Sequence, residues 1–312
     1  MGPYILWMAM LQVAAGADLA PLLSPGARVE KLATDMGFTE GPVWLPGDRR
    51  LVFSDIPASK LMQWTAAEGV TTFRGSEHAN GNLLDLEGRL LSCQHGARNV
   101  IRYEVDGTVT VLAERFEGKR FNSPNDIAVS SDGSLWFTDP PWGLTDLTEG
   151  KELAGHWVFR LDVETGTVAA VIRDLVMPNG IAFSPDGSRL YVSDTGGHPS
   201  HPHAEYRERP ATVSAYEVRG TGVLSATPVW RVETVCDGMC VDVLGNIYAT
   251  GVKGVTVLAP DGETLGTIEV EEQPANVCFG GLDFKTLFIT ARTSLYSLDM
   301  RVRGSRPRGS KW

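Results

Sequence analysis

One sequence pattern occurs six times in this chain, and it constrains the fold more than any local feature. Each copy begins near a polar residue, continues as an apolar strand, turns, and returns as a second apolar strand. The copies are TEGPVWLPGDRRLVFSD (39–55), ANGNLLDLEGRLLSC (79–93), SPNDIAVSSDGSLWFTD (123–139), MPNGIAFSPDGSRLYVSD (177–194), CDGMCVDVLGNIYAT (236–250) and ANVCFGGLDFKTLFIT (275–290). Repeats spaced by roughly 40 to 60 residues indicate structural units stacked in a line or around an axis.

The strands that follow these hairpins predict how the units close. Six third strands can be found but only five fourth strands, and the missing one is most simply ARVEKLA (27–33), at the other end of the chain. A ring of four-stranded sheets whose first strand completes the last sheet leaves no open edge. The sequence therefore predicts an all-β six-bladed β-propeller over about 27–300, closed by this N-terminal strand.

Two segments lie outside the predicted propeller. Residues 1–26 form an N-terminal extension whose apolar stretch lacks preceding basic residues and is too short to span a membrane. We expect it to pack on the propeller of a cytoplasmic protein. The alternative is that residues 1–16 act as a signal, which would make the protein periplasmic or secreted. The basic tail 301–312 is rich in Gly, Ser and Pro and is predicted to be disordered.

The charge of the chain excludes one class of partner. The formal net charge is −10, whereas binding to a phosphate backbone depends on clustered Lys and Arg. We therefore expect no nucleic-acid partner and no membrane partner, and the sequence leaves the oligomeric state open. The four cysteines lack the spacing of zinc ligands and are interpreted as small buried apolar residues.

Polar residues recur at the start of the first strand of most copies. Because the innermost strands of a propeller line its axis, we expect these side chains to point at one centre. The residues are Glu40, Asn80, Asn125, Asn179 and Asp237, and the sixth copy offers Ala275 or Asn276. Carboxylate and amide oxygens suit one divalent metal ion, most simply Ca²⁺, with Mg²⁺, Mn²⁺ and Zn²⁺ as alternatives. The competing interpretation is that each side chain only bonds the local backbone.

The connecting segments on the same face supply further candidates. All six histidines fall there, and His95 is a candidate proton carrier because imidazole titrates near neutrality. A structural His bonding a loop carbonyl is an equal alternative. The histidines of GGHPSHPHAEYRER (196–209) could form a second metal site, but a solvated lid is the stronger expectation. The insertion 139–156 brings Trp142 over the same mouth.

Several segments together resemble a known family. TEGPVW, RFNSPNDIAVSSDGSLWFTDP, PNGIAFSPDGSRLYVSDT and CDGMCVD resemble signature segments of the gluconolactonase, senescence-marker-protein and luciferin-regenerating-enzyme-like family. The segment 79–107 is especially similar to the bacterial gluconolactonase branch. The resemblance implies a six-bladed propeller that holds one divalent cation, often Ca²⁺, at the top of the channel.

The resemblance also implies roles for individual residues. Glu40, Asn179 and Asp237 would ligate the metal, and Asn125 matches a position that touches the metal or the substrate. Asp237 further matches the residue proposed as the base. The arginine that grips sugar hydroxyls in some members has only Arg120 and Arg98 as candidates here.

These expectations combine into a metal-dependent hydrolase that opens a small-molecule sugar lactone, such as glucono-1,5-lactone, to its aldonic acid. The metal would polarise the carbonyl, and Asp237 or His95 would activate water. Asn125 and Asn80 would orient substrate hydroxyls, Trp142 would form an apolar wall, and Arg120 would contact the substrate. The alternatives are another lactone or an organophosphate at the same site, or a non-catalytic propeller that binds a sugar or a protein.

Overall fold

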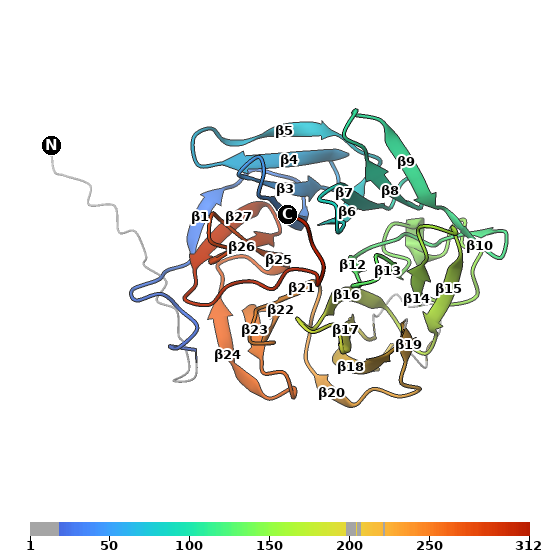
Figure 1. Ribbon diagram of the computed structural model, residues 1–312. Helices are drawn as coiled ribbons and strands as arrows, with labels where there is room; N and C mark the ends of the chain where they lie inside the picture. Colours follow the sequence, from blue (N-terminus) through green and yellow to red (C-terminus); the bar gives the residue numbers. More distant parts are fainter. Residues whose placement is uncertain (1–18, 198–203, 205–206, 221) are drawn as a thin grey trace, which may run out of the picture.

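The six repeats form six antiparallel sheets around a central axis. The structure, a computed structural model, describes residues 19–197, 204, 207–220 and 222–312. Figure 1 shows the sheets following one another around the ring in chain order. The all-β six-bladed propeller predicted from the repeats is confirmed.

Each sheet is one blade, and its innermost strand comes first in the chain except where the ring closes. Blade 1 comprises β2 (Thr39–Leu45), β3 (Arg50–Asp55), β4 (Lys60–Thr65) and β5 (Gly69–Gly75); blade 2 comprises β6 (Ala79–Leu84), β7 (Leu90–Gln94), β8 (Asn99–Tyr103) and β9 (Val109–Ala113). Blade 3 comprises β12 (Ile127–Val129), β13 (Leu135–Asp139), β14 (Trp157–Leu161) and β15 (Val168–Ile172). Blade 4 comprises β16 (Pro178–Phe183), β17 (Arg189–Asp194), β18 (Thr212–Arg219), β19 (Val223–Leu224) and β20 (Trp230–Glu233). Blade 5 comprises β21 (Met239–Val241), β22 (Ile247–Thr250), β23 (Gly254–Leu258) and β24 (Thr264–Glu269).

The ring closes as the sequence predicts. Blade 6 contains β25 (Pro274–Gly280), β26 (Thr286–Ala291) and β27 (Ser294–Asp299), and its outer strand is β1 (Glu30–Ala33) from the start of the chain. β1 pairs antiparallel with β27, with Glu30 opposite Ser297. Apolar side chains pack between neighbouring blades, as where Trp44 of blade 1 stacks on Phe288 of blade 6 with ring centroids 5.6 Å apart.

In several blades the aspartate at the end of the second strand binds the backbone segment that leads into the first strand of the same blade. Both carboxylate oxygens of Asp139 accept hydrogen bonds of 2.8 Å from the backbone amides of Asn122 and Ser123. Asp194 binds the amides of Val176 and Met177 in the same way, also at 2.8 Å. Asp55 likewise accepts from Gly37 and Phe38. Each pair of amides lies two or three residues before the polar residue that opens the first strand.

Hydroxyl groups of second strands connect neighbouring blades. Ser54, Thr138, Ser193 and Thr250 each donate to a backbone carbonyl in the next blade, and the acceptors are Asn80, Asn179, Asp237 and Ala275, at 2.7, 2.6, 3.1 and 2.9 Å. Three of these acceptors are residues that the sequence places in the site. The same bonds that join the blades therefore also position the site.

The predicted disorder of the tail 301–312 is wrong, because this segment makes specific contacts. We call Arg301–Trp312 the C-terminal strap. Its Trp312 indole donates to the carbonyl of Asp85 at 2.7 Å, and the guanidinium of Arg306 lies 3.9 Å from the ring centre of Phe284. Aromatic packing of this kind outweighs the polar composition that suggested disorder.

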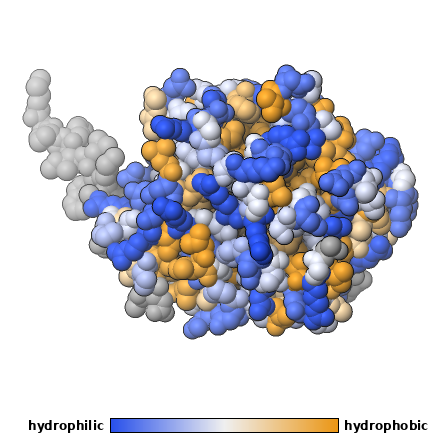
Figure 2. Space-filling model, viewed as in Figure 1, coloured by the Kyte–Doolittle hydropathy of each residue, from blue (hydrophilic) through white to orange (hydrophobic). Residues whose placement is uncertain are grey.

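The strap lies at one end of the central channel. Its backbone pairs with the turns between first and second strands, as at the bridge between Gly304 and Asp242. Those turns are at the end of the channel opposite to the starts of the first strands. Figure 2 shows this face as a closed surface of mixed polar and apolar groups.

At the other end of the chain, Leu19, Leu22 and Leu23 are buried in the core near blades 5 and 6. This part of the N-terminal extension packs on the propeller, whereas residues 1–18, which carry the question of a signal, lie outside the described residues. Within the described part of the chain, no helix is long and apolar enough to cross a membrane.

Candidate functional site

The hydrogen bonds between blades show that the polar residues share one register. In three blades the residue after the ring position donates its amide to the ring residue of the next blade, as Gly81 does to the carbonyl of Asn125 and Gly180 to that of Asp237, at 2.8 and 2.7 Å. Gly238 donates in the same way to Ala275, so Ala275 and not Asn276 occupies the sixth position. We call the other five the polar ring: Glu40, Asn80, Asn125, Asn179 and Asp237.

Two carboxyl groups of the polar ring lie close enough to repel one another. Burial, and then the negative charge of Asp237, raise the pKa of Glu40 well above its ordinary value. Burial raises the pKa of Asp237 to about 7, against a hydrogen bond from Asn179 that lowers it. Two carboxylates that lie close together in a largely buried place are costly, and a bound cation would relieve that cost.

Asn80 and His95 form a pair at the edge of the ring. The side-chain nitrogen of Asn80 lies 3.2 Å from Nε2 of His95, which therefore accepts this bond as the neutral imidazole. Burial, with a smaller contribution from the charge of His78, lowers the pKa of His95 to about 4. The Oδ1 atom of Asn80 is buried and has no hydrogen-bond partner in the structure, which marks it as an acceptor available to a ligand.

The insertion after β13 covers this pair. The backbone of Gly143 packs against His95 so closely that an added Cβ would lie 2.6 Å from the Cβ of His95. The amide of Gly143 also donates to the hydroxyl of Ser123 at 2.9 Å. The adjacent residue, Trp142, is half-buried and belongs to the same insertion.

The candidate Arg120 is engaged elsewhere. It lies in β11 (Lys119–Arg120), which pairs with β10 (Arg115–Phe116), and its guanidinium donates to the carbonyl of Ala97 at 2.8 Å. The other candidate, Arg98, is buried and donates to the carbonyls of Phe121 and Gly150. Both arginines hold the loops around the mouth. The histidines 198, 201 and 203 lie outside the described residues.

The structure places at the site one residue that sequence reasoning missed, Asp126. It also assigns Asn276 to the position that follows the polar ring. Asp126 follows Asn125 and is buried, and burial raises its pKa to about 7. Its negative charge also raises the pKa of Glu40 and of Asp237, which places it against both. Asn276 is its counterpart in blade 6. A signal was present in the sequence, because Asp126 directly follows a ring residue at a position where four other copies have glycine.

The polar ring fits a hard divalent cation. Within residues 19–197, 204, 207–220 and 222–312, no group of three or more His, Cys, Asp or Glu side chains could hold a metal. The ring supplies two carboxylates and several amide oxygens, and it contains no thiolate or imidazole. Oxygen-only sets of this kind suit Ca²⁺ or Mg²⁺.

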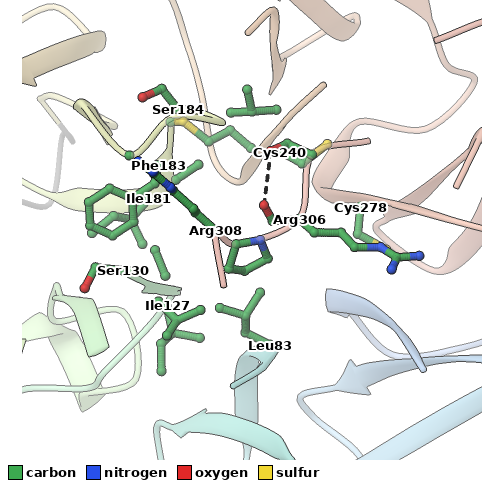
Figure 3. A pocket seen from close by; sticks show the side chains of 18 of the residues that line it. Leu83, Ile127, Ser130, Ile181, Phe183, Ser184, Cys240, Cys278, Arg306 and Arg308 are labelled. Carbon is green, nitrogen blue, oxygen red and sulfur yellow. Dashed lines mark hydrogen bonds between the residues drawn. The ribbon is translucent and has the colours of Figure 1, made fainter. Parts of the chain in front are cut away.

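A cavity of about 480 Å³ occupies the channel on the other side of the ring. Figure 3 shows its apolar wall, with Leu83, Ile127, Ile181 and Phe183, and shows Arg306 and Arg308 of the C-terminal strap beside it. Asp126 and Asn276 line it, whereas no residue of the polar ring does. The cavity is therefore separate from the mouth at which His95 and Trp142 lie.

Comparison with known proteins identifies similar chains. Residues 38–293 match the family model described as the SMP-30/Gluconolactonase/LRE-like region. The chain is 34% identical to the gluconolactonase of Zymomonas mobilis, over 92% of this chain and 85% of that protein. It is 30% identical to the pentonolactonase of Haloferax volcanii, over 80% of each chain. Among solved structures, a gluconolactonase from Xanthomonas campestris is 33% identical with a TM-score of 0.80, covering 93% of this chain and 94% of that one.

Proposed function

Because the chain belongs to the SMP-30/Gluconolactonase/LRE-like family, we propose that it is a metal-dependent lactonase that opens a sugar lactone to its aldonic acid. The observation that carries the proposal is the convergence of two carboxyl groups, those of the buried Glu40 and the half-buried Asp237, with amide groups at one end of the channel. A propeller that served only as a scaffold would need apolar packing there. Similarity to gluconolactonases over almost the whole chain supports the reaction class.

The proposed metal ligands are Glu40, Asn179 and Asp237, with Asn125 beside them. A divalent cation held there would supply Lewis-acid polarisation of the lactone carbonyl. The donor set favours Ca²⁺, because it is oxygen-only and mixes carboxylates with neutral amides.

The remaining residues bind and orient the substrate. Asn80 offers its unpartnered Oδ1 to a substrate hydroxyl, and Asn125 offers its amide from the neighbouring blade. Trp142 supplies an apolar wall at the mouth. Arg120, whose guanidinium holds the carbonyl of Ala97, supports the mouth near His95 and contacts substrate only at the edge of the site.

Asp237 is a better candidate than His95 for the base that removes a proton from water. The Nε2 lone pair of His95 already accepts a hydrogen bond from Asn80, and burial makes this imidazole a weak base. His95 then acts by orienting Asn80. Burial raises the pKa of Asp237 to about 7, so its carboxylate is the stronger base of the two.

The test is acid release from glucono-1,5-lactone, followed with a pH indicator against spontaneous hydrolysis. We expect the purified protein to accelerate the reaction, EDTA to abolish the acceleration, and Ca²⁺, Mg²⁺, Mn²⁺ or Zn²⁺ to restore it to different degrees. The same assay on a pentonolactone tests the second candidate substrate, which the 30% identity to a pentonolactonase favours.

If neither lactone nor a phosphotriester is hydrolysed above background in any metal state, the proposed activity is wrong. The polar ring would then belong to a propeller that binds a ligand without transforming it.

A further inference from the structure

The second position of each first strand forms another layer directly beneath the polar ring. In four blades this position is glycine, namely Gly41, Gly81, Gly180 and Gly238. In blades 3 and 6 it is Asp126 and Asn276, and both side chains are buried. These blades are three steps apart in a ring of six, so the two side chains approach one another from opposite walls of the channel (Figure 1).

The orientation of Asn276 is determined by its own backbone. Its Oδ1 accepts a hydrogen bond of 2.8 Å from the amide of Val277. The NH₂ group then points the other way, into the channel and toward the carboxyl groups of Glu40 and Asp126, and it lowers the pKa of both. One neutral donor thus lies between two acidic side chains that would otherwise repel each other.

Asp126 is anchored just as firmly on the other wall. Its Oδ1 accepts from the amide of Ile127 at 2.9 Å, and the backbone amide of Ile181 in blade 4 lowers the pKa of its carboxyl group. The pair therefore connects blades 3, 4 and 6 across the axis, and Glu40 brings in blade 1.

The glycines of this layer leave the space that the pair occupies. A Cβ added to Gly238 would lie 2.1 Å from Cγ of Asn276, and one added to Gly81 would lie 2.7 Å from Oδ1 of Asp126. Any side chain at either position would displace the pair. The sequence thus places two polar side chains and two glycines where they fit together.

The pair also separates two environments. Asp126 and Asn276 line the cavity of about 480 Å³, whose walls beyond them are largely apolar. On their other side lies the polar ring. Without the pair, the polar ring would open directly onto this cavity.

We propose that Asp126 and Asn276 form a crossbar that holds Glu40 in position as a metal ligand and forms the floor of the metal site. The inference rests on the proposed function, since it concerns how that site is held. Asn276 is a positioning residue, because it acts on the metal through Glu40. Partners that orient a ligand commonly contribute 10-fold to 100-fold to metal affinity, by the order of magnitude known for such groups.

The test measures Ca²⁺ binding to the full chain by calorimetry after EDTA treatment. We expect Asn276→Ala to weaken binding by at least about tenfold. Because the residue acts through the metal, saturating Ca²⁺ should restore the turnover number on glucono-1,5-lactone to within about twofold of the wild-type value, while the Ca²⁺ concentration needed rises.

Cys278→Ala is the matched control. Cys278 lies two residues further along β25, on the same face of the strand, and it lines the cavity below the crossbar. We expect this variant to lose some stability but to bind Ca²⁺ with the wild-type affinity. Equal weakening in both variants would mean that only general packing is involved, and would overturn the proposal.

A double-mutant cycle tests the crossbar itself. If the two side chains act as one unit, Asp126→Ala combined with Asn276→Ala should weaken binding by clearly less than the product of the two single effects. Independent, multiplicative effects would overturn the crossbar. If the wild-type protein binds no divalent cation at all, the proposed function itself has failed, whereas wild-type binding that is unchanged by Asn276→Ala defeats only this inference.

Discussion

At the scale of single residues, the site is a set of polar groups whose usual partners are missing. Asn80 leaves its Oδ1 unpaired although it is buried, and Glu40 shares a confined space with Asp237. Unpaired buried polar atoms and crowded carboxyl groups reduce the stability of the fold unless a ligand binds them, and they are typical of positions that bind a ligand. His95 differs from these groups, because its nitrogen already has a partner and burial holds it neutral.

The low pKa of His95 predicts a specific dependence of stability on pH. Its pKa of about 4 in the folded protein lies below its ordinary value of 6.5, so the unfolded chain binds the additional proton first. Stability should therefore decrease as the pH falls from about 6.5 to 4 and the contribution should level off below that, by up to about 3 kcal/mol in total.

The measurement compares urea unfolding of the wild type and of His95→Gln in EDTA from pH 7 to pH 4. Glutamine can accept the bond from Asn80 but does not titrate. The wild type should lose more stability than the variant over this interval, and parallel curves would show that His95 titrates normally.

At the scale of elements, the second strand of a repeat fixes the position of the first strand. The second strand supplies an aspartate that holds the entry of its own blade and a hydroxyl that binds the next blade. In blade 4, Asp194 binds the amides of Val176 and Met177 just before Asn179, and it also accepts from Gly196 at 3.0 Å. The terminal aspartate of the repeat is thus a structural residue that fixes the position of Asn179, a proposed metal ligand.

We predict that Asp194→Asn weakens Ca²⁺ binding by about tenfold, because Asn179 loses its fixed position. The same change should reduce the free energy of unfolding by about 1–3 kcal/mol, since a buried carboxylate that accepts several amides is replaced. Calorimetry and denaturant unfolding measure the two effects. Asp186→Asn, in the exposed turn of the same hairpin, should leave metal affinity unchanged, and an equal effect there would contradict the prediction.

At the scale of the whole molecule, one terminal segment closes the ring of blades and the other covers one end of the channel. β1 completes blade 6 and so joins the two ends of the ring, and the C-terminal strap covers the end of the channel opposite to the polar ring. The strap binds turns of several blades, including that of Asp85 in blade 2 and that of Phe284 in blade 6. It therefore adds contacts between blades that are distant in the chain.

Replacing Trp312 by alanine should reduce the free energy of unfolding by about 2 kcal/mol, because the indole packs against Phe284 and Arg306 and donates to Asp85. Metal affinity should not change, since the cavity and the crossbar lie between the strap and the polar ring. Denaturant unfolding and calorimetry are the measurements. The control is Lys311→Ala, which removes an exposed ion pair with Glu87 and should cost less than about 1 kcal/mol. Equal losses in the two variants would show that the indole contributes nothing specific.

The architecture and most of the polar ring could be predicted from the sequence, because they depend on patterns that repeat. Alternating strands, turn residues and a polar residue at one register are local features of the sequence. Because the repeat occurs six times, each feature is easier to recognise than in a single copy. The family resemblance rests on the same local segments, and the match over residues 38–293 confirms it.

The tertiary structure alone decided what depends on contacts between distant parts of the chain. Asp126 and Asn276 are 150 positions apart and become partners only because blades 3 and 6 face each other across the axis. The strap is ordered only because turns from several blades surround Trp312 and Arg306, which no composition of the tail could reveal. The ring and the register of its polar residues could be predicted from the repeat, since both follow from local patterns. Closure of the ring determined which side chains meet at its centre.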